Sequence, residues 1–414
     1  MSPPRIVRSD VSTGLLRCRN MGIALAVVVL LSLFLYSWGN GPAATPDSWH
    51  YLAAARNWVA MKELRGPTGA PYVIWGPLYP LLLASLGSSN HEMVRALVWL
   101  HALGLIGSLL GWSWLGTQLL GRETAWKRLY PWVLAVSTPW LLTAKFVWSE
   151  TGFVLLFTAY AVALYSYLTT SRISWLLIAT IAGLLLPLQR TAGFFLLAGV
   201  ALGLLLAYGR TLRPYAFWLL LHLLLSAAGG FLWQIRVWRT GLDIPLVFSN
   251  SATVGVQALA DFSFMLVHWV LPLPIPAGAV PWGYLAGGIL LVVILIIGAR
   301  EVGRFGQLLL ITVGVYVALH AVSYLLSRGA AGFHDSERYA AVFFAPIMLL
   351  LFGAMRRTLG KHPRLLHLLL LLWLLYPVVR ALHNVAFLRS RPTPQLTALP
   401  YPAAQTARIA VGLH

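Results

Sequence analysis

Long stretches of almost uninterrupted apolar residues alternate with short polar stretches along the whole chain. The segment from Met21 to Trp38 is one example, and the segment from Ile289 to Ala299 belongs to another. An apolar run of about 18 or more residues can cross the ~30 Å hydrocarbon core of a bilayer as a helix. Only helices and closed barrels can satisfy their backbone groups in lipid, and barrel strands alternate apolar and polar residues. The continuous runs therefore predict transmembrane helices.

The pattern predicts an all-α, polytopic helix bundle of about eleven spans, with boundaries uncertain by several residues. The expected spans are residues 21–38, 94–120, 130–147, 150–168, 173–188, 191–208, 215–236, 283–299, 306–327, 339–355 and 365–387. The two runs beside Gln189 and Arg190 could also form one long, broken helix. The first run could be a cleaved signal peptide, but it is longer than a typical signal core and many spans follow.

The predicted spans are expected to form one transmembrane domain over residues 1–390, followed by a short C-terminal tail over 391–414. Two long loops, 39–93 and 240–282, lie on the same face in this arrangement. Both contain Trp, Pro and apolar stretches. Such segments are predicted to form interfacial helices on the bilayer surface.

The composition supports a membrane protein and explains the net charge. Hydrophobic residues make up 59% of the chain and charged residues only 10%, whereas a soluble domain carries about 25% charged residues. The net charge of +19 could indicate nucleic-acid binding. More than half of the basic residues, however, lie in segments that face inward if the N-terminus is cytoplasmic. This alternation predicts a multi-pass inner-membrane protein with a cytoplasmic N-terminus and no nucleic-acid partner.

The acidic residues show the opposite distribution. Most of the 11 fall on the outer side or at the outer ends of spans: Asp47, Glu63, Glu92, Glu150, Asp243, Asp261, Asp335 and Glu337. Acidic residues contribute little to orientation, so topology does not require this bias. Carboxylates at a membrane are candidate functional groups. The single cysteine, Cys18, allows no internal disulfide and no Cys/His metal motif.

The first outer loop contains a segment with helix-forming alanines and a proline suited to a first helical turn. On such a helix Asp47, His50 and Tyr51 share one face. Asp47 could cap the helix, or it could act as a base in a pocket lined by His50 or Tyr51.

Three further polar segments are candidates. The short turn after Lys145 places Glu150 at the start of a span, while Lys145 could extend to the membrane interface. Arg190 lies between two apolar runs and could anchor the interface or bind a phosphate. The most polar outer loop precedes a late span and holds His334, Asp335, Glu337, Arg338 and Tyr339. This loop could bind a metal, a sugar or a phosphate, or its charges could pair with one another.

The order of these elements resembles the bacterial branch of the GT-C glycosyltransferases, the class of protein O-mannosyltransferases and lipid A aminoarabinose transferases. The matching elements run from residue 47 to about 346: Asp47 with Tyr51, the Trp-Gly-Pro-Leu-Tyr-Pro segment from Trp75, Arg95, the segment Pro139 to Glu150, Arg190, and Arg338-Tyr339 with Pro346.

The resemblance implies transfer of a sugar from a polyprenyl-phosphate carrier to a hydroxyl of a lipid, glycan or protein on the extracytoplasmic face. It implies that Asp47 is the catalytic base and Glu150 a second active-site carboxylate. Arg190 and Arg338 would hold the departing phosphate, and His50, Tyr51, Lys145, His334 and Tyr339 would line the substrate site. The resemblance implies no certain cofactor, and it leaves the need for a divalent metal open. Ser48 follows Asp47 where some relatives have Asp-Glu, and no soluble C-terminal domain is expected, so the outer loops would recognise the acceptor.

Other functions remain open at this point. A lipid-linked-sugar flippase or transporter is the main alternative, although transporters often contain inverted repeats with a site near mid-membrane. The sequence contains no such repeat, and its carboxylates cluster on one face. An O-antigen ligase or polymerase-like enzyme and a structural or assembly role are further alternatives.

Overall fold

The computed structural model describes residues 10–121, 124–209, 211–241, 252–272, 281–326, 336–359 and 363–390. The predicted site residue His334, the predicted tail over 391–414 and parts of the loop 240–282 lie outside these described residues.

The described residues form helices and no strand, apart from two isolated backbone bridges. This confirms the all-α prediction. The α-helices are α1 (Asp10–Ser37), α2 (Pro46–Met61), α3 (Leu78–Leu86), α4 (Asn90–Leu119), α5 (Thr124–Ala135), α6 (Thr138–Lys145), α7 (Glu150–Thr170), α8 (Ile173–Gln189), α9 (Gly193–Tyr208), α10 (Ala216–Arg239), α11 (Ala252–His268), α12 (Pro281–Val302), α13 (Arg304–Leu326), α14 (Ser336–Ala340), α15 (Phe344–Leu359) and α16 (Pro363–Ser390). Three short 3₁₀ turns join them: η1 (Trp38–Asn40), η2 (Arg213–Tyr215) and η4 (Ala341–Phe343).

Within the described residues, eight helical segments are long and apolar enough to cross a membrane, and three shorter apolar helices accompany them. The chain is therefore a multi-pass membrane protein, while the count of eleven spans stays a prediction. The predicted span 130–147 is divided into α5 and α6. The division follows from Ser137 and Pro139, because the Ser137 hydroxyl accepts from the Trp140 backbone N–H at 3.4 Å and caps a new helix.

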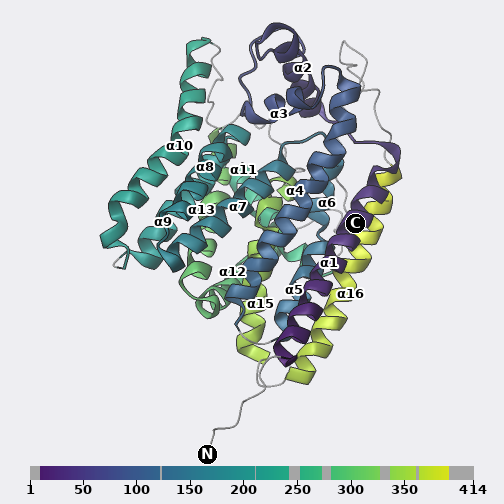
Figure 1. Ribbon diagram of the computed structural model, residues 1–414, viewed down its shortest axis with the longest axis vertical. Helices are drawn as coiled ribbons and strands as arrows, with labels where there is room; N and C mark the ends of the chain where they lie inside the picture. Colours follow the sequence, from purple (N-terminus) through teal and green to yellow (C-terminus); the bar gives the residue numbers. More distant parts are fainter. Residues whose placement is uncertain are drawn as a thin grey trace, which may run out of the picture.

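The long helices lie side by side, with α1 and α16 adjacent along one edge (Figure 1). The first long loop contains α2 and α3, which pack together at the end of the bundle far from the start of α1 (Figure 1). The second contains α11, which packs along α12 and α13 with Phe262, Met265 and Val267 in the core.

Glycines allow several helices to approach closely. A Cβ atom at Gly298 of α12 would lie 1.9 Å from the Leu350 carbonyl oxygen of α15, and one at Gly199 of α9 would lie 2.7 Å from the Thr312 Cα of α13. Such small-residue contacts are the usual way in which membrane helices pack. The Gly298 contact involves the segment Ser336–Arg357, of whose apolar window 89% is buried. This enclosed segment carries Glu337 and Arg338 into the protein.

Candidate functional site

Asp47 lies in the first turn of α2, but it does not cap the helix. The capping groups are Thr45 and Ser48: the Thr45 backbone N–H donates to the Ser48 hydroxyl at 3.0 Å, and the two hydroxyl oxygens lie 3.4 Å apart. Pro46 occupies the first helical position, where a missing N–H has no cost. The Asp47 carboxylate is therefore available for another partner, and its Oδ2 pairs with Arg338 Nη2 at 2.7 Å.

Backbone hydrogen bonds tie the segment before α2 to the turn before α7. The Ala43 N–H donates to the Lys145 carbonyl at 2.9 Å, and the Val147 N–H donates to the Ala43 carbonyl at 3.1 Å. The Lys145 ammonium donates to the carbonyls of Ser37 at 2.6 Å and Gly41 at 2.7 Å. Lys145 thus holds the loop at the end of α1, and the structure does not bring it together with the ionised groups of the candidate site.

Glu150 is the first residue of α7 and is almost completely enclosed, with 3% of its side chain exposed. Its Oε1 forms ion pairs with both Arg190 and Arg338. Arg190 lies in the break between α8 and α9. The structure has two separate helices here, as the predicted spans 173–188 and 191–208 indicated, since α8 ends at Gln189 and α9 begins at Gly193.

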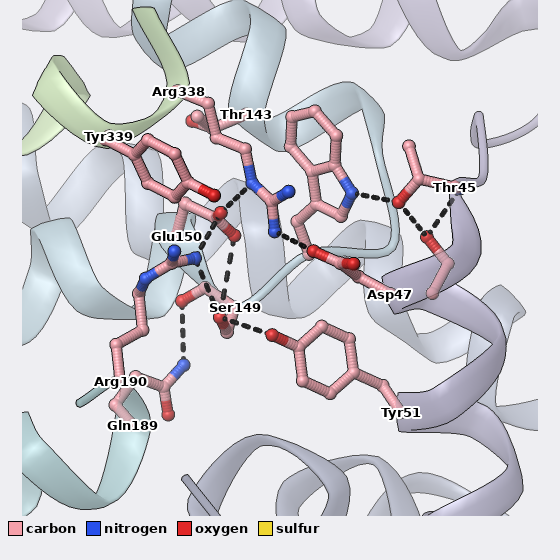
Figure 2. Close-up of polar contacts among 12 residues, drawn as sticks. Thr45, Asp47, Tyr51, Thr143, Ser149, Glu150, Gln189, Arg190, Arg338 and Tyr339 are labelled. Carbon is pink, nitrogen blue, oxygen red and sulfur yellow. Dashed lines mark hydrogen bonds and ion pairs between the residues drawn. The ribbon is translucent and has the colours of Figure 1, made fainter. Parts of the chain in front are cut away.

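Four ionised side chains from distant parts of the sequence therefore form one network. Figure 2 shows Arg338 between Asp47 and Glu150, with Arg190 on the other side of Glu150. The guanidinium carbon of Arg338 also lies 4.0 Å from the centre of the Trp148 ring. Tyr339 completes the group, with the guanidinium carbons of Arg190 and Arg338 at 5.3 and 5.7 Å from its ring centre. Such cation–π contacts add to the stability of a buried arginine.

Neutral polar groups hold this network in place. The Ser149 hydroxyl lies 3.2 Å from the Tyr51 hydroxyl and accepts from Arg190 Nη1 at 3.3 Å, while the Gln189 side-chain amide donates to the Ser149 carbonyl at 2.8 Å (Figure 2). Burial raises the pKa of the Tyr51 phenol, with Arg190 acting in the opposite direction. Tyr51 therefore stays protonated and serves as a neutral hydrogen-bonding group.

His50 lies beside the network, and its imidazole contacts an aromatic ring. Its ring packs edge-on against Trp75 at 5.3 Å between centroids. Burial lowers the pKa of His50, and the nearby Asp47 carboxylate partly opposes this effect. His50 is therefore neutral at neutral pH and belongs to the aromatic wall formed by Trp75, Tyr51 and Tyr79.

A second buried ion pair lies directly behind Arg338 and was not foreseen as part of the site. Arg380 Nη2 of α16 pairs with Glu337 Oε1 at 3.0 Å, and the Trp269 indole N–H donates to the same oxygen at 3.2 Å. An arginine within a predicted span is by itself a functional signal, and this signal could have identified Arg380. Ser149, Trp148 and Gln189 carry no such signal apart from their position beside Glu150 and Arg190.

The two carboxylates of the network differ in access to solvent. Asp47 has 21% of its side chain exposed, compared with 3% for Glu150. Asp47 can therefore meet a second molecule, whereas Glu150 acts on the two arginines that surround it. Among the described residues, no three His, Cys, Asp or Glu side chains come together in a way that could hold a metal ion.

Comparison with known proteins identifies the fold. No protein-family model matches the chain, and no curated protein matches its sequence. The archaeal oligosaccharyltransferase AglB from Archaeoglobus fulgidus, in complex with an inhibitory peptide and a dolichol-phosphate, matches with a TM-score of 0.54 at 14% identity. ArnT from Cupriavidus metallidurans, bound to undecaprenyl phosphate, matches with a TM-score of 0.53 at 16% identity.

Each match covers 91% of this chain, which spans 56% of the length of the archaeal enzyme and 74% of the length of the bacterial one. Both neighbours are GT-C glycosyltransferases, and each structure contains a bound lipid phosphate. The chain therefore has the transmembrane fold of the GT-C glycosyltransferases.

Proposed function

We propose that this protein transfers a sugar from a polyprenyl-phosphate donor to a hydroxyl group of a lipid, glycan or protein on the extracytoplasmic face of the cell membrane. One observation carries the proposal: Asp47, Glu150, Arg190 and Arg338 meet in a single ion-paired network in the GT-C fold. The polyprenyl phosphates bound in two neighbours of this fold support the choice of donor.

Asp47 is the proposed general base. Transfer forms a bond between the acceptor oxygen and the anomeric carbon, while the bond from that carbon to the phosphate oxygen breaks. The acceptor hydroxyl loses its proton to the Asp47 carboxylate, and the bonding electron pair leaves with the phosphate. Arg338 holds the Oδ2 atom of Asp47. The partly exposed carboxylate is thereby oriented while its Oδ1 atom remains for the acceptor proton.

Arg190 and Arg338 are the proposed phosphate-stabilising groups. A guanidinium group can bond two phosphate oxygens with its planar fork. Stabilising the charge that develops on a leaving group is commonly the largest single contribution to catalysis. Glu150 pairs with both arginines and would keep them aligned. A donor phosphate would compete with Asp47 and Glu150 for Arg338, and with Glu150 for Arg190.

The network favours a single displacement with inversion at the anomeric carbon, as in the family that the sequence resembles. Asp47 would act on the acceptor and the arginines on the leaving group. The enclosed Glu150 is already engaged by two cations and is therefore a poor nucleophile for a covalent sugar intermediate.

The test is Asp47→Asn in the full-length protein, which keeps the side-chain shape and removes the base. A general base contributes about 10²- to 10⁴-fold to the rate, so we expect a loss of that size. Glu63→Gln is the matched control, because Glu63 is an exposed carboxylate in the same outer loop and pairs only locally with Arg65 at 2.6 Å. Sugar transfer at the wild-type rate by well-expressed Asp47→Asn would overturn the assignment.

The same variants distinguish transfer from transport. In a deletion strain, mass spectrometry of glycolipids and glycoproteins is expected to show an acceptor that lacks one sugar unit, restored by wild type and Glu63→Gln but not by Asp47→Asn. Accumulation of a complete lipid-linked precursor, without any shortened acceptor, would instead indicate a flippase or a ligase.

A further inference from the structure

A cavity of about 650 Å³ lies at the far end of α9 from the candidate site. Helix α9 begins three residues after Arg190 and ends at Tyr208, about 22 Å away at 1.5 Å per residue. The cavity is lined by Leu205, Leu206, Tyr208, Thr211, Arg213 and Arg304. It therefore lies near the opposite membrane face, where the sequence predicts the cytoplasmic side.

The packing of α9 and α13 explains why a cavity opens here. A Cβ atom at Gly203 of α9 would lie 3.0 Å from the Leu308 side chain of α13, so the two helices are in close contact at that level. One turn later α9 ends, and the chain passes through η2 into α10. The end of α9, Thr211 and Arg213 of the connection, and the first residue of α13 line the open space between the two helices.

The cavity carries uncompensated positive charge. Arg213 and Arg304 both line it, and its lining includes no carboxylate among the residues that the structure describes. Arg304 Nη1 donates to the Thr211 hydroxyl at 3.3 Å. Glu301, three residues earlier in the chain, is engaged elsewhere by Arg356 Nη2 at 2.5 Å. Two cations are thus available to an anion that enters the cavity.

The wall of the cavity is apolar on the side that continues along α9. Leu205 is 67% exposed and Leu206 is 65% exposed. Leucines with this exposure on a transmembrane helix face the hydrocarbon region, so a ligand in the cavity can have its charged part beside the arginines and its apolar part along the helix. A free phosphate ion would use only the first of these features.

We propose that this cavity binds the headgroup of an anionic phospholipid. Basic pockets between transmembrane helices are typical sites for anionic lipid headgroups. The two guanidinium groups would bond the phosphate oxygens, with the Thr211 hydroxyl as a neutral partner. The acyl chains would lie along Leu205 and Leu206, and the volume falls within the roughly 300–1,000 Å³ common for ligand sites.

The experiment is native mass spectrometry of the purified full-length chain in detergent, titrated with phosphatidylglycerol or phosphatidylcholine. Each basic residue near an anionic lipid contributes a factor of about five in affinity, so Arg213→Gln with Arg304→Gln is expected to weaken phosphatidylglycerol binding about 30-fold. Arg172→Gln is the matched control, because it removes an exposed arginine from the α7–α8 connection at the same end of the bundle. This control is expected to bind like wild type.

Equal phosphatidylglycerol binding by wild type and the double variant would overturn the proposal. So would equal binding of phosphatidylcholine by the wild type, or loss of the bound lipid on addition of inorganic phosphate alone. If the double variant is not monodisperse, Arg213→Gln alone replaces it, with an expected loss of about fivefold. Within the described residues, the Arg213 side chain makes no hydrogen bond that this change would remove. None of these measurements depends on sugar transfer, so the site stands or falls separately from the proposed function.

Discussion

Arg338 is the residue on which the geometry of the candidate site depends most. It contacts Asp47 and Glu150, and its guanidinium carbon lies 4.0 Å from the ring centre of Trp148 and 5.7 Å from that of Tyr339. A lysine at this position keeps the charge but has neither the fork nor the planar face. The shape of the arginine, and not only its charge, should therefore matter for activity.

We expect Arg338→Lys to lower the rate of sugar transfer by about tenfold or more. The reason is that one ammonium group cannot hold the carboxylates of Asp47 and Glu150 in their observed positions. The charge balance is kept, so the variant should still fold, with a thermal unfolding midpoint close to that of wild type. Arg65→Lys is the control, since Arg65 is exposed and pairs only with Glu63. An Arg338→Lys enzyme with wild-type turnover would show that the arginine geometry is not needed.

The ionised residues of the site and Tyr51 could be foreseen from the sequence, but the neutral partners Ser149 and Gln189 could not. Asp47, Glu150, Arg190 and Arg338 stood out because charges are rare and costly at a membrane. Ser149 and Gln189 are common residues whose roles arise only when α7 and α8 are placed side by side. The roles of all these residues in catalysis stay predictions.

Lys145 was named as a site residue from the sequence, but the structure gives it other partners. Its position beside Glu150 in the sequence suggested a shared pocket, but its ammonium group is directed to the carbonyls of Ser37 and Gly41. These acceptors belong to a segment more than 100 residues away in the chain. A pairing of this kind carries no local sequence signal.

At the scale of elements, the short helix α14 connects two ion-paired groups. Glu337 is held by Arg380 of α16 and by Trp269 after α11, while the next residue, Arg338, reaches the candidate site. Successive residues of a helix point in different directions. The Glu337–Arg380 pair therefore fixes the rotation of α14, and with it the position of Arg338.

We expect Arg380→Gln to destabilise the protein by about 3–5 kcal/mol, because it leaves the Glu337 carboxylate buried without its cation. The double variant with Glu337→Gln removes both charges and should recover most of that stability. Sugar transfer by the double variant should nevertheless remain reduced, since an amide pair fixes α14 less firmly than an ion pair does. Thermal unfolding and turnover, measured on the same preparations, separate the two effects.

Full activity in the stable double variant would mean that the pair contributes only to folding. Recovery of neither stability nor activity would mean that the two charges do not act as a pair. In both cases α14 would need another explanation for its orientation.

The connection between the first outer loop and α8 depends on one glycine. A Cβ atom at Gly76 would lie 2.0 Å from the Leu188 carbonyl oxygen, which belongs to the backbone and cannot rotate away. The Trp233 indole N–H holds the same segment by donating to the Trp75 carbonyl at 3.2 Å. The loop is therefore seated directly against the helix end that precedes Arg190.

We expect Gly76→Ala to cost about 1–3 kcal/mol of stability, as is typical when a side chain is forced into a packed site. It should also lower activity, because the aromatic wall beside Asp47 would move away from α8. Gly22→Ala is the control, since a Cβ atom there meets nothing within 4 Å. Wild-type stability and turnover in both variants would show that the loop is not held in this way.

At the scale of the whole molecule, the length of the apolar runs was enough to predict an all-α fold. It was not enough to predict where a run is divided into two helices. Each long apolar run had to become a helix because lipid offers no hydrogen-bond partners. The division of 130–147 into α5 and α6 depends instead on one serine cap and one proline, Ser137 and Pro139. A single serine and a single proline are weak evidence for a helix boundary when the residues around them are apolar. Such a boundary is therefore difficult to predict without a structure.

The orientation of the molecule in the membrane is the remaining whole-molecule prediction, and the two ends of the bundle make it testable. Glu63 is exposed in the loop after α2, at the end that holds the candidate site, whereas Arg357 is exposed in the last turn of α15, which runs away from that site. The basic loops predict that the end with Glu63 faces outward.

Cys18 is the only cysteine of the chain, so a Cys18→Ser background allows single cysteines to be placed at either end. In intact spheroplasts, a membrane-impermeant thiol reagent is expected to label Glu63→Cys and to leave Arg357→Cys unlabelled until the membrane is opened. Both positions are exposed, so a difference in labelling reports the side of the membrane and not burial. The reverse pattern would place Asp47 and its arginines in the cytoplasm, where a donor on the outer leaflet could not reach them, and the proposed extracytoplasmic transfer would then be wrong.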